Sequence, residues 1–291
     1  MRILFLADLH WRPLEVSLKE NDFKAFLKRN EITAIVVCGD LGNDTVPAEL
    51  RRLAGEGVPI AVALGNHDFW RHPERRDRLT FEDLTLRHWK PLCDEAGVIL
   101  LDERNLDLAD VTIVGGYGHY DLGFAMQTIL SDEGSAIPIT EEDYLLGGMI
   151  GKRGMWQDVV KMPSGKSLFE EARLQRGAIV GRIDEAIVRG GRVLVALHTI
   201  PFHELNGHEP DFFRAYSGNA LLGLELLLKG RAERIELLVC GHTHLPAEGI
   251  FGGMHCVNVG SDYRQLQGIV YDSFMQRVQW VDILRGDGAC R

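Results

Sequence analysis

The sequence predicts a layered α/β fold that contains two mixed β-sheets. Three observations indicate this class. Short, continuous apolar runs are bounded by glycines or polar turns, as in strands that are buried on both faces. Helical patterns separate the first of these runs, which implies parallel strands joined by right-handed crossovers. The C-terminal part, in contrast, contains strand patterns only.

The first part of the chain reads as a βαβαβ unit. Its three strands are predicted at Ile3–Ala7, Ala34–Cys38 and Ile60–Leu64, each a continuous apolar run. Helices are predicted between them, at Leu14–Arg29 and Val46–Glu56. These strands should therefore lie side by side and in parallel.

The middle of the chain changes in character. Arg71–Ala96 is predicted to form one or two charged helices, and short strands are predicted at Val98–Leu101 and Val111–Val114. Tyr117–Lys166 is rich in glycine, has mixed charge and contains isolated aromatic residues. We expect this stretch to be an insertion or cap rather than part of a sheet.

The second half of the chain again contains patterns of helices and strands that belong to the core. Ser167–Arg189 has the apolar spacing of an amphipathic helix. Val193–Leu197 and Ile235–Cys240 are predicted core strands, with a helix at Leu221–Leu228 between them. The remaining strands should form a meander, and they are predicted at Ile250–Phe251, His255–Val259, Gly268–Tyr271 and Val278–Ile283.

Composition limits the possible function classes. The 291 residues are 45% hydrophobic and 25% charged, which is typical of a globular protein. The formal net charge of −10 disfavours binding of extended nucleic acid, which needs a basic surface. A phosphate substrate remains compatible with this charge, because bound divalent cations can reverse the sign of the local field.

Cysteine usage and hydropathy indicate a cytoplasmic protein. The cysteines are odd in number and widely spaced, so reduced thiols are expected rather than disulfides. The apolar N-terminal stretch is too short for a signal peptide, and no segment approaches the ~20 apolar residues of a membrane span. We therefore expect no membrane partner. The cysteines are Cys38, Cys93, Cys240, Cys256 and Cys290.

Side chains that bind metals follow five of the predicted core strands directly. The carboxyl ends of strands in open α/β sheets are where ligands bind, so these side chains should meet at one edge. Carboxylate oxygens and imidazole nitrogens suit divalent Mn, Fe, Ni or Zn. The glycines before Asp40, Asn66 and His242 should let the backbone turn tightly and approach closely. The residues after the strands are Asp8 and His10, Asp40 and Asn43, Asn66, His67 and Asp68, His198, and His242 and His244.

Four short motifs contain most of these residues: D-x-H, G-D-x-x-N, G-N-H-D and G-H-x-H. The first motif alone is expected by chance about once per chain and carries no information. All four in this order would occur by chance in roughly one chain in 10⁵ or fewer. Helix N-capping by Asp8 and Asp40, or a turn role for Asn66, is therefore the weaker interpretation.

In these stretches the sequence resembles the calcineurin-like metallophosphoesterases. The resemblance covers most of the chain and implies a four-layer αββα sandwich of two mixed sheets with flanking helices. We expect a single domain over residues 1–291, with the insertion or cap at about 117–166 matching no family motif. The matching stretches are Asp8-Leu9-His10, Gly39-Asp40-Leu41-Gly42-Asn43, Gly65-Asn66-His67-Asp68, His198, Gly241-His242-Thr243-His244 and Asn258-Val259-Gly260-Ser261.

The resemblance also implies ligands for two divalent metal ions. They are Asp8, His10 and His244 for the first ion, Asn66, His198 and His242 for the second, and Asp40 as the bridge. His198 is assigned because it directly follows a predicted strand, and His203 and His208 are alternatives to it. Asn43 belongs to its motif without being assigned as a ligand.

The implied reaction is attack of a metal-bridging hydroxide on phosphorus, in line with the departing oxygen. His67 would protonate that oxygen, and Asp68 would orient the His67 ring. Candidate substrate contacts are Asn43, Arg71, His119 and Tyr120. Lys152, Arg153 and Lys161 are more simply read as solvated surface, although they could meet a phosphate.

We therefore predict a metal-dependent phosphoric ester hydrolase that acts on a small phosphorylated molecule or nucleotide, with a phosphodiester favoured over a phosphomonoester. Alternatives are a nuclease on short nucleic acid and a non-catalytic scaffold of the same fold. A protein phosphatase ranks lower, because no extended acceptor surface is visible in the sequence. The oligomeric state is not predicted.

Overall fold

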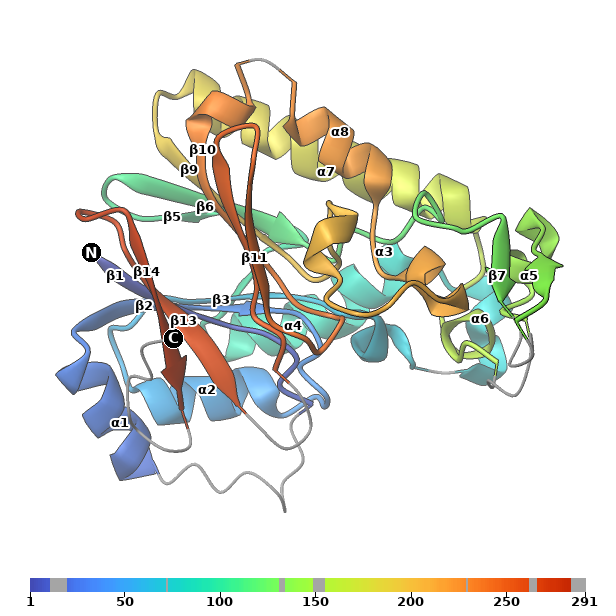
Figure 1. The fold of residues 1–291 in the computed structure, drawn as a ribbon. Coiled ribbons are helices and arrows are strands. Elements are labelled where there is room, and N and C mark those ends of the chain that lie inside the picture. The colour runs from blue at the N-terminus through green and yellow to red at the C-terminus, as the bar shows by residue number, and fades with distance from the viewer. Residues whose placement is uncertain are drawn as a thin grey trace.

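The computed structural model describes residues 1–10, 20–71, 73–130, 134–148, 155–228, 230–261 and 266–283. Two six-stranded sheets form its centre, with strand orders β14-β13-β1-β2-β3-β4 and β11-β12-β10-β9-β6-β5 (Figure 1). The first sheet contains β1 (Arg2–Leu6), β2 (Ile32–Cys38), β3 (Ile60–Ala63), β4 (Ile99–Leu100), β13 (Gln267–Asp272) and β14 (Arg277–Asp282). The second contains β5 (Leu106–Asp107), β6 (Val111–Gly116), β9 (Arg192–Leu197), β10 (Ile235–Cys240), β11 (Ala247–Phe251) and β12 (Met254–Asn258).

Helices cover the outer face of each sheet, so the predicted four-layer αββα sandwich is confirmed. Against the first sheet pack α1 (Glu20–Arg29), α2 (Val46–Ala54), α3 (Phe81–Leu84) and α4 (Lys90–Glu95). Against the second pack α7 (Leu168–Val188) and α8 (Ala220–Leu226). Figure 1 shows the two helical layers on opposite sides of the paired sheets.

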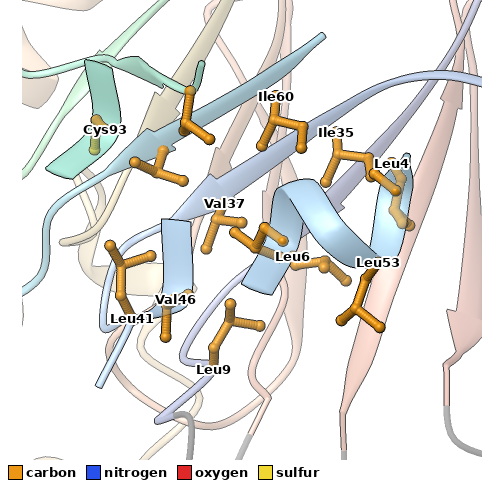
Figure 2. Packing of buried hydrophobic residues seen from close by; sticks show 14 of the residues in the cluster. Leu4, Leu6, Leu9, Ile35, Val37, Leu41, Val46, Leu53, Ile60 and Cys93 are labelled. Carbon is orange, nitrogen blue, oxygen red and sulfur yellow. The ribbon is translucent and has the colours of Figure 1, made fainter. Parts of the chain in front are cut away.

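Successive side chains of a buried strand point to opposite faces of the sheet, so each strand contributes to two layers of the core. In β1, Leu4 and Leu6 pack with the helices of the outer layer (Figure 2). Ile3 and Phe5 face the second sheet and join the core between the sheets. Because both faces are covered, the strand reads as a continuous apolar run instead of an alternating one.

The predicted parallel unit is present. β1 pairs in parallel with β2, β2 with β3, and β3 with β4. In the second sheet β9 lies parallel to both β6 and β10. These parallel strands end at a common edge, and that edge carries the predicted ligands.

The C-terminal strands do not form one meander. β11 and β12 make a hairpin that joins the second sheet through parallel pairing of β12 with β10. β13 and β14 make another hairpin that joins the first sheet beside β1. Strand patterns alone do not reveal which sheet a hairpin joins, because either sheet buries the same apolar residues.

Several boundaries also differ from the prediction. Helix α1 begins at Glu20, and the predicted start at Leu14 lies outside the described residues. β5 was not predicted, because its two residues are too few to show a periodic pattern. The stretch after Arg71 is divided into a 3₁₀ helix at Pro73–Arg78, α3, a π-helical turn at Thr85–Trp89 and α4.

The segment at 117–166 lies beside one end of the sandwich, at the right of Figure 1. It contains β7 (Thr128–Leu130), β8 (Ala136–Pro138), α5 (Glu141–Leu145) and α6 (Asp158–Lys161). Tyr120 and Tyr144 of this segment pack against Phe212 and Tyr216, which belong to the loop after β9. Within the described residues, no helix has both the length and the apolar character to cross a membrane.

Candidate metal centre

The backbone is unusual where the predicted ligands lie. Asp8, His10, Asp40, His242 and His244 all have positive φ, between 39° and 73°. Side chains other than glycine rarely adopt this conformation, which costs roughly 1–2 kcal/mol per residue. Such strain persists only when the surrounding structure imposes it, and it concentrates at functional sites.

The glycines that precede three of the ligands allow close approach, as predicted. A Cβ atom on Gly39 would lie 2.3 Å from Nδ1 of His198, and one on Gly65 would lie 2.2 Å from Oδ1 of Asp40. A Cβ atom on Gly241 would lie 2.6 Å from Oδ2 of Asp8. Any larger residue at these positions would push the loops apart.

A first group of side chains meets at the ends of β1, β2 and β10. Ligand atoms from Asp8, His10, Asp40 and His244 all lie within 4.8 Å of one another. Nε2 of His10 is 3.3 Å from Nε2 of His244 and 3.4 Å from Oδ2 of Asp40. Two carboxylates and two imidazoles from separate loops thus surround one point, a donor set that suits a divalent cation.

A second group lies beside the first and is buried. Oδ1 of Asn66 lies 3.0 Å from Nε2 of His198 and 3.1 Å from Nδ1 of His242. The two imidazole nitrogens are themselves 3.1 Å apart. Asp40 connects the groups, because its Oδ1 is 3.4 Å from Nε2 of His198 and its Oδ2 faces His10.

Hydrogen bonds on the outer side of His198 and His242 determine which ring nitrogen of each faces inward. Nδ1 of His198 lies 3.0 Å from the carbonyl oxygen of Cys38, and Nε2 of His242 lies 3.0 Å from that of Tyr216. Each of these nitrogens must donate its proton to the carbonyl. Burial lowers the pKa of His242 to about 3 and that of His198 well below its usual value, so both rings are neutral. Lone pairs of both rings therefore point at the carbonyl oxygen of Asn66.

These residues fit a bound cation by a test within the structure. Oδ2 of Asp8 and Oδ2 of Asp40 are buried and accept no hydrogen bond from the described residues. Burial raises the pKa of both carboxyls, and neighbouring carboxylates add to this effect at Asp40. Unpaired buried acceptors and facing lone pairs are strongly unfavourable unless a positive charge lies among them. The structure therefore supports divalent metal binding at this site.

His67 lies at the mouth of the site. Its Nε2 is 4.0 Å from Oδ2 of Asp40, and its side chain is 28% exposed. The ring stacks on Trp70 with 3.9 Å between centroids. The pKa of His67 is lowered to about 4, mainly by burial and in smaller part by the nearby His244 and Lys161.

Asp68 has a different environment from the predicted one. Its carboxylate accepts hydrogen bonds from the backbone amides of Leu41, Gly42 and Gly65 at 2.8–3.2 Å. Both oxygens are thus used to join the loops after β2 and β3, and neither orients the His67 ring. Stacking on Trp70 holds that ring instead.

A cavity of about 430 Å³ opens from the cluster toward solvent. Trp156 and Phe213 form an aromatic wall with 5.6 Å between ring centroids. Arg214 also lines the cavity, and its buried Nε makes no hydrogen bond to the described residues. The lining residues are Asp40, Asn66, His67, Trp156, Asn206, His208, Asp211, Phe213, Arg214, Ser217, His242, Thr243 and His244.

The predicted substrate contacts lie elsewhere. Asn43 accepts hydrogen bonds from Thr45 at the start of α2, and Arg71 pairs with Asp44 at 3.1 Å. His119 and Tyr120 are almost completely buried and line a neighbouring cavity instead of the one at the cluster. Lys152, Arg153 and Cys290 lie outside the described residues, while Lys161 lies over the Trp70 ring at 4.0 Å.

The structure also distinguishes among the histidines after β9. His198 lies in the cluster, whereas His203 is exposed and pairs with Glu204 at 3.2 Å. His208 contacts the carbonyl oxygen of Thr243 and lines the cavity. Apart from His208, which was considered as an alternative ligand, the cavity residues from Asn206 to Ser217 were missed by sequence reasoning. Their one signal was their position after a ligand-bearing strand.

Comparisons with known proteins agree with this geometry. The model of the calcineurin-like phosphoesterase family matches residues 1–246. A search of curated protein sequences gives no significant match. Among solved structures, the phosphopantetheinyl hydrolase PptH from Mycobacterium tuberculosis is similar at a TM-score of 0.66 and 16% identity, over 90% of this chain and 89% of that one. A dimetal phosphatase from Danio rerio is similar at a TM-score of 0.52 and 15% identity, over 93% and 95% of the two chains.

At these identities the two solved structures support the fold and nothing finer. The family match is stronger, because it spans well over half of the chain and includes every predicted ligand up to His244. On that ground, this chain belongs to the calcineurin-like phosphoesterase family.

Proposed function

We propose that the protein is a two-metal phosphoesterase that hydrolyses a small phosphorylated molecule, with diesters favoured over monoesters. The single observation that carries this proposal is the pair of adjacent ligand groups that share Asp40 and open into one cavity. One oxygen of Asp40 faces each group, as expected for a bridging carboxylate.

In this proposal seven residues hold the two ions. Asp8, His10 and His244 hold the first ion, Asn66, His198 and His242 hold the second, and Asp40 contacts both. Bound divalent ions supply charge stabilisation to the phosphoryl oxygens and lower the pKa of the water that attacks phosphorus. Mn, Fe, Ni and Zn all suit this mixture of oxygen and nitrogen ligands.

His67 is the proposed general acid. It lies in the cavity wall, and Trp70 holds its ring plane by stacking. Its low pKa means that the ring is neutral at pH 7 until an anion approaches. A bound phosphate raises the pKa of a nearby imidazole, so substrate binding itself favours the protonated form that donates to the leaving oxygen.

The cavity supports the preference for a small diester. Apart from the charge that the bound ions would supply, Arg214 alone among the described lining residues carries a permanent positive charge, and Asp211 carries a negative one. A dianionic monoester would need more compensation than a monoanionic diester. The wall of Trp156 and Phe213 offers an apolar surface to an esterifying group.

We infer that the segment at 117–166 acts as a cap for this cavity. Trp156 is its contribution to the lining. The segment packs on the loop that supplies Phe213 and Arg214, through the contact of Tyr144 with Tyr216. Substrate selection would then depend on residues that the family motifs do not include.

The test compares bis-p-nitrophenyl phosphate with p-nitrophenyl phosphate. Metal-stripped protein is assayed after separate addition of Mn²⁺, Fe²⁺, Ni²⁺ and Zn²⁺. We expect hydrolysis only with metal and a higher kcat/KM for the diester. Activity that is undiminished without metal, or absent with all four ions, would contradict the proposal. A higher kcat/KM for the monoester would contradict the diester preference alone.

A further inference from the structure

Asp158 is a buried carboxylate that no motif predicts. It begins α6 in the segment at 117–166 and is 2% exposed. Three side-chain N–H groups donate to it. Oδ1 accepts from Nδ2 of Asn66 at 3.1 Å and from Nε1 of Trp70 at 2.7 Å, and Oδ2 accepts from Nε1 of Trp156 at 3.0 Å.

The bond to Asn66 decides which end of that amide faces the cluster. An ionised carboxylate accepts hydrogen bonds and donates none, so the NH₂ group of Asn66 must face Asp158. The carbonyl oxygen then faces Nε2 of His198 and Nδ1 of His242. If the amide turned over, its N–H groups would donate to these two nitrogens and occupy the lone pairs that a cation needs.

The same helix also reaches the proposed general acid. Trp70 donates to Asp158 at its edge, while Lys161, one turn further along α6, lies 4.0 Å from the centre of its ring. Trp70 in turn stacks on His67. Helix α6 therefore contacts both the predicted ligand Asn66 and Trp70, the residue on which His67 stacks.

We propose that Asp158 is a positioning residue that orients the Asn66 amide, and that it makes binding of the second ion depend on the segment at 117–166. This inference rests on the proposed function, because it takes Asn66 to be a metal ligand. Outer hydrogen-bond partners of metal ligands typically change metal affinity 10–100-fold.

The test measures Mn²⁺ binding to the metal-stripped full-length protein by calorimetry, with metal content checked by mass spectrometry. Wild type should bind two ions. Asp158→Leu removes the acceptor, and we expect about 10–100-fold weaker binding of one ion with the other unchanged. Asp158→Asn keeps one oxygen for Asn66 and Trp70, so its affinity should stay within a few-fold of wild type. If Asp158→Leu does not fold, Asp158→Ala removes the same acceptor without added bulk.

Two controls separate positioning from a general structural role. In an Asn66→Ala background, Asp158→Leu should cause no further loss of affinity, because the amide that it orients is gone. Asp121 is a buried carboxylate nearby that accepts from the backbone amides of Gly123, Ala220 and Leu221. Asp121→Leu should leave both Mn²⁺ affinities unchanged.

The outcomes distinguish the two proposals. Wild-type protein that binds fewer than two Mn²⁺ ions would contradict the proposed two-metal function and, with it, this inference. Two ions in wild type with unchanged affinities in Asp158→Leu and Asp158→Ala would overturn the role of Asp158 alone. An equal loss in Asp121→Leu, or a full further loss in the Asn66→Ala background, would also overturn it.

Discussion

At the scale of single residues, the centre depends on buried carboxylate oxygens that accept no hydrogen bond from the described residues. Asp40 places one oxygen near His198 and the other near His10, and the second accepts no hydrogen bond from the described residues. Burial of such a carboxylate is unfavourable by several kcal/mol unless a cation compensates it. The site is therefore built for metal at the expense of the stability of the metal-free protein.

Asp40→Ala should release both proposed ions, because each ligand group loses a carboxylate oxygen. We expect metal content below one ion per chain by mass spectrometry, and no rise in melting temperature when Mn²⁺ is added. Asp44→Ala is the matched control, since Asp44 lies on the same loop and pairs with Arg71. Complete retention of either ion in Asp40→Ala would argue against a bridging role.

His67→Asn should keep both proposed ions and lose the proposed proton donor. Turnover of diesters with poor, alkyl leaving groups should fall about 10²–10⁴-fold, and that of p-nitrophenyl esters much less, because a good leaving group needs no proton. The measurement is kcat for both substrate types with metal content checked. His203→Asn, at an exposed histidine outside the cavity, serves as control. Equal turnover of alkyl esters by His67→Asn and wild type would remove His67 from the acid role.

At the scale of elements, short helices near the site depend on their caps. α3 has four residues and continues directly into the π-helical turn at Thr85–Trp89 and α4, so Thr80 caps the start of a longer helical stretch. Thr80 accepts from the amide of Asp83 at 3.1 Å, and the Asp83 carboxylate accepts from the amide and hydroxyl of Thr80. The helix then packs Phe81 against Phe69, which follows the G-N-H-D motif.

Thr80→Ala should lower the free energy of unfolding by about 1 kcal/mol, because an amide at the helix start loses its acceptor. Urea unfolding of metal-stripped protein measures this. Thr140→Ala tests the same arrangement at the start of α5. Thr128→Ala, at an exposed strand position, should change stability by less than about 0.5 kcal/mol. An equally small change in Thr80→Ala would show that this cap contributes nothing measurable.

At the scale of the whole molecule, a few polar groups join the two sheets. The carboxylate of Asp102 accepts from the amide of Leu64 after β3 and from that of Tyr117 after β6, each at 2.8 Å. Arg182 of α7 donates to the carbonyl oxygens of Leu101 and Gly115 beside it. The relative position of the sheets, and hence of the two ligand groups, depends on such contacts.

Asp102 predicts a pH dependence of stability. Burial raises the pKa of its carboxyl in the folded state above the usual 3.8. Between these two pKa values the folded protein holds more protons than the unfolded chain, so the contribution of Asp102 to stability falls as pH rises through that window. Above the folded-state pKa, the contribution of Asp102 to stability no longer changes with pH.

Urea unfolding of metal-stripped wild type and Asp102→Asn from pH 4 upward measures this contribution. The stability of wild type relative to the variant should decrease with rising pH and then become constant. A difference that stays constant throughout, or that grows with pH, would contradict the prediction. Comparing two proteins at each pH cancels the titration of the other carboxylates.

Local sequence determined much of this protein. The apolar runs predicted the parallel strands, and the Asp, Asn and His residues that follow them predicted the ligand cluster. Both predictions were possible because a strand and its end are visible in the local sequence. Asp8, Asp40 and His242 could be recognised for this reason. The need for glycine before Asp40 could also be predicted from the sequence, because a side chain at that position would prevent the loops from approaching closely.

Tertiary structure alone decided the remainder. The Asp68 carboxylate bonds to backbone amides of another loop, the C-terminal hairpins divide between two sheets, and Asp158 reaches Asn66 across 92 positions in the chain. None of these pairings leaves a periodic or local pattern, because a hydrogen bond depends on where folded elements meet. The sequence by itself therefore identified the candidate metal ligands, while packing decided their orientation and the shape of the cavity that they face.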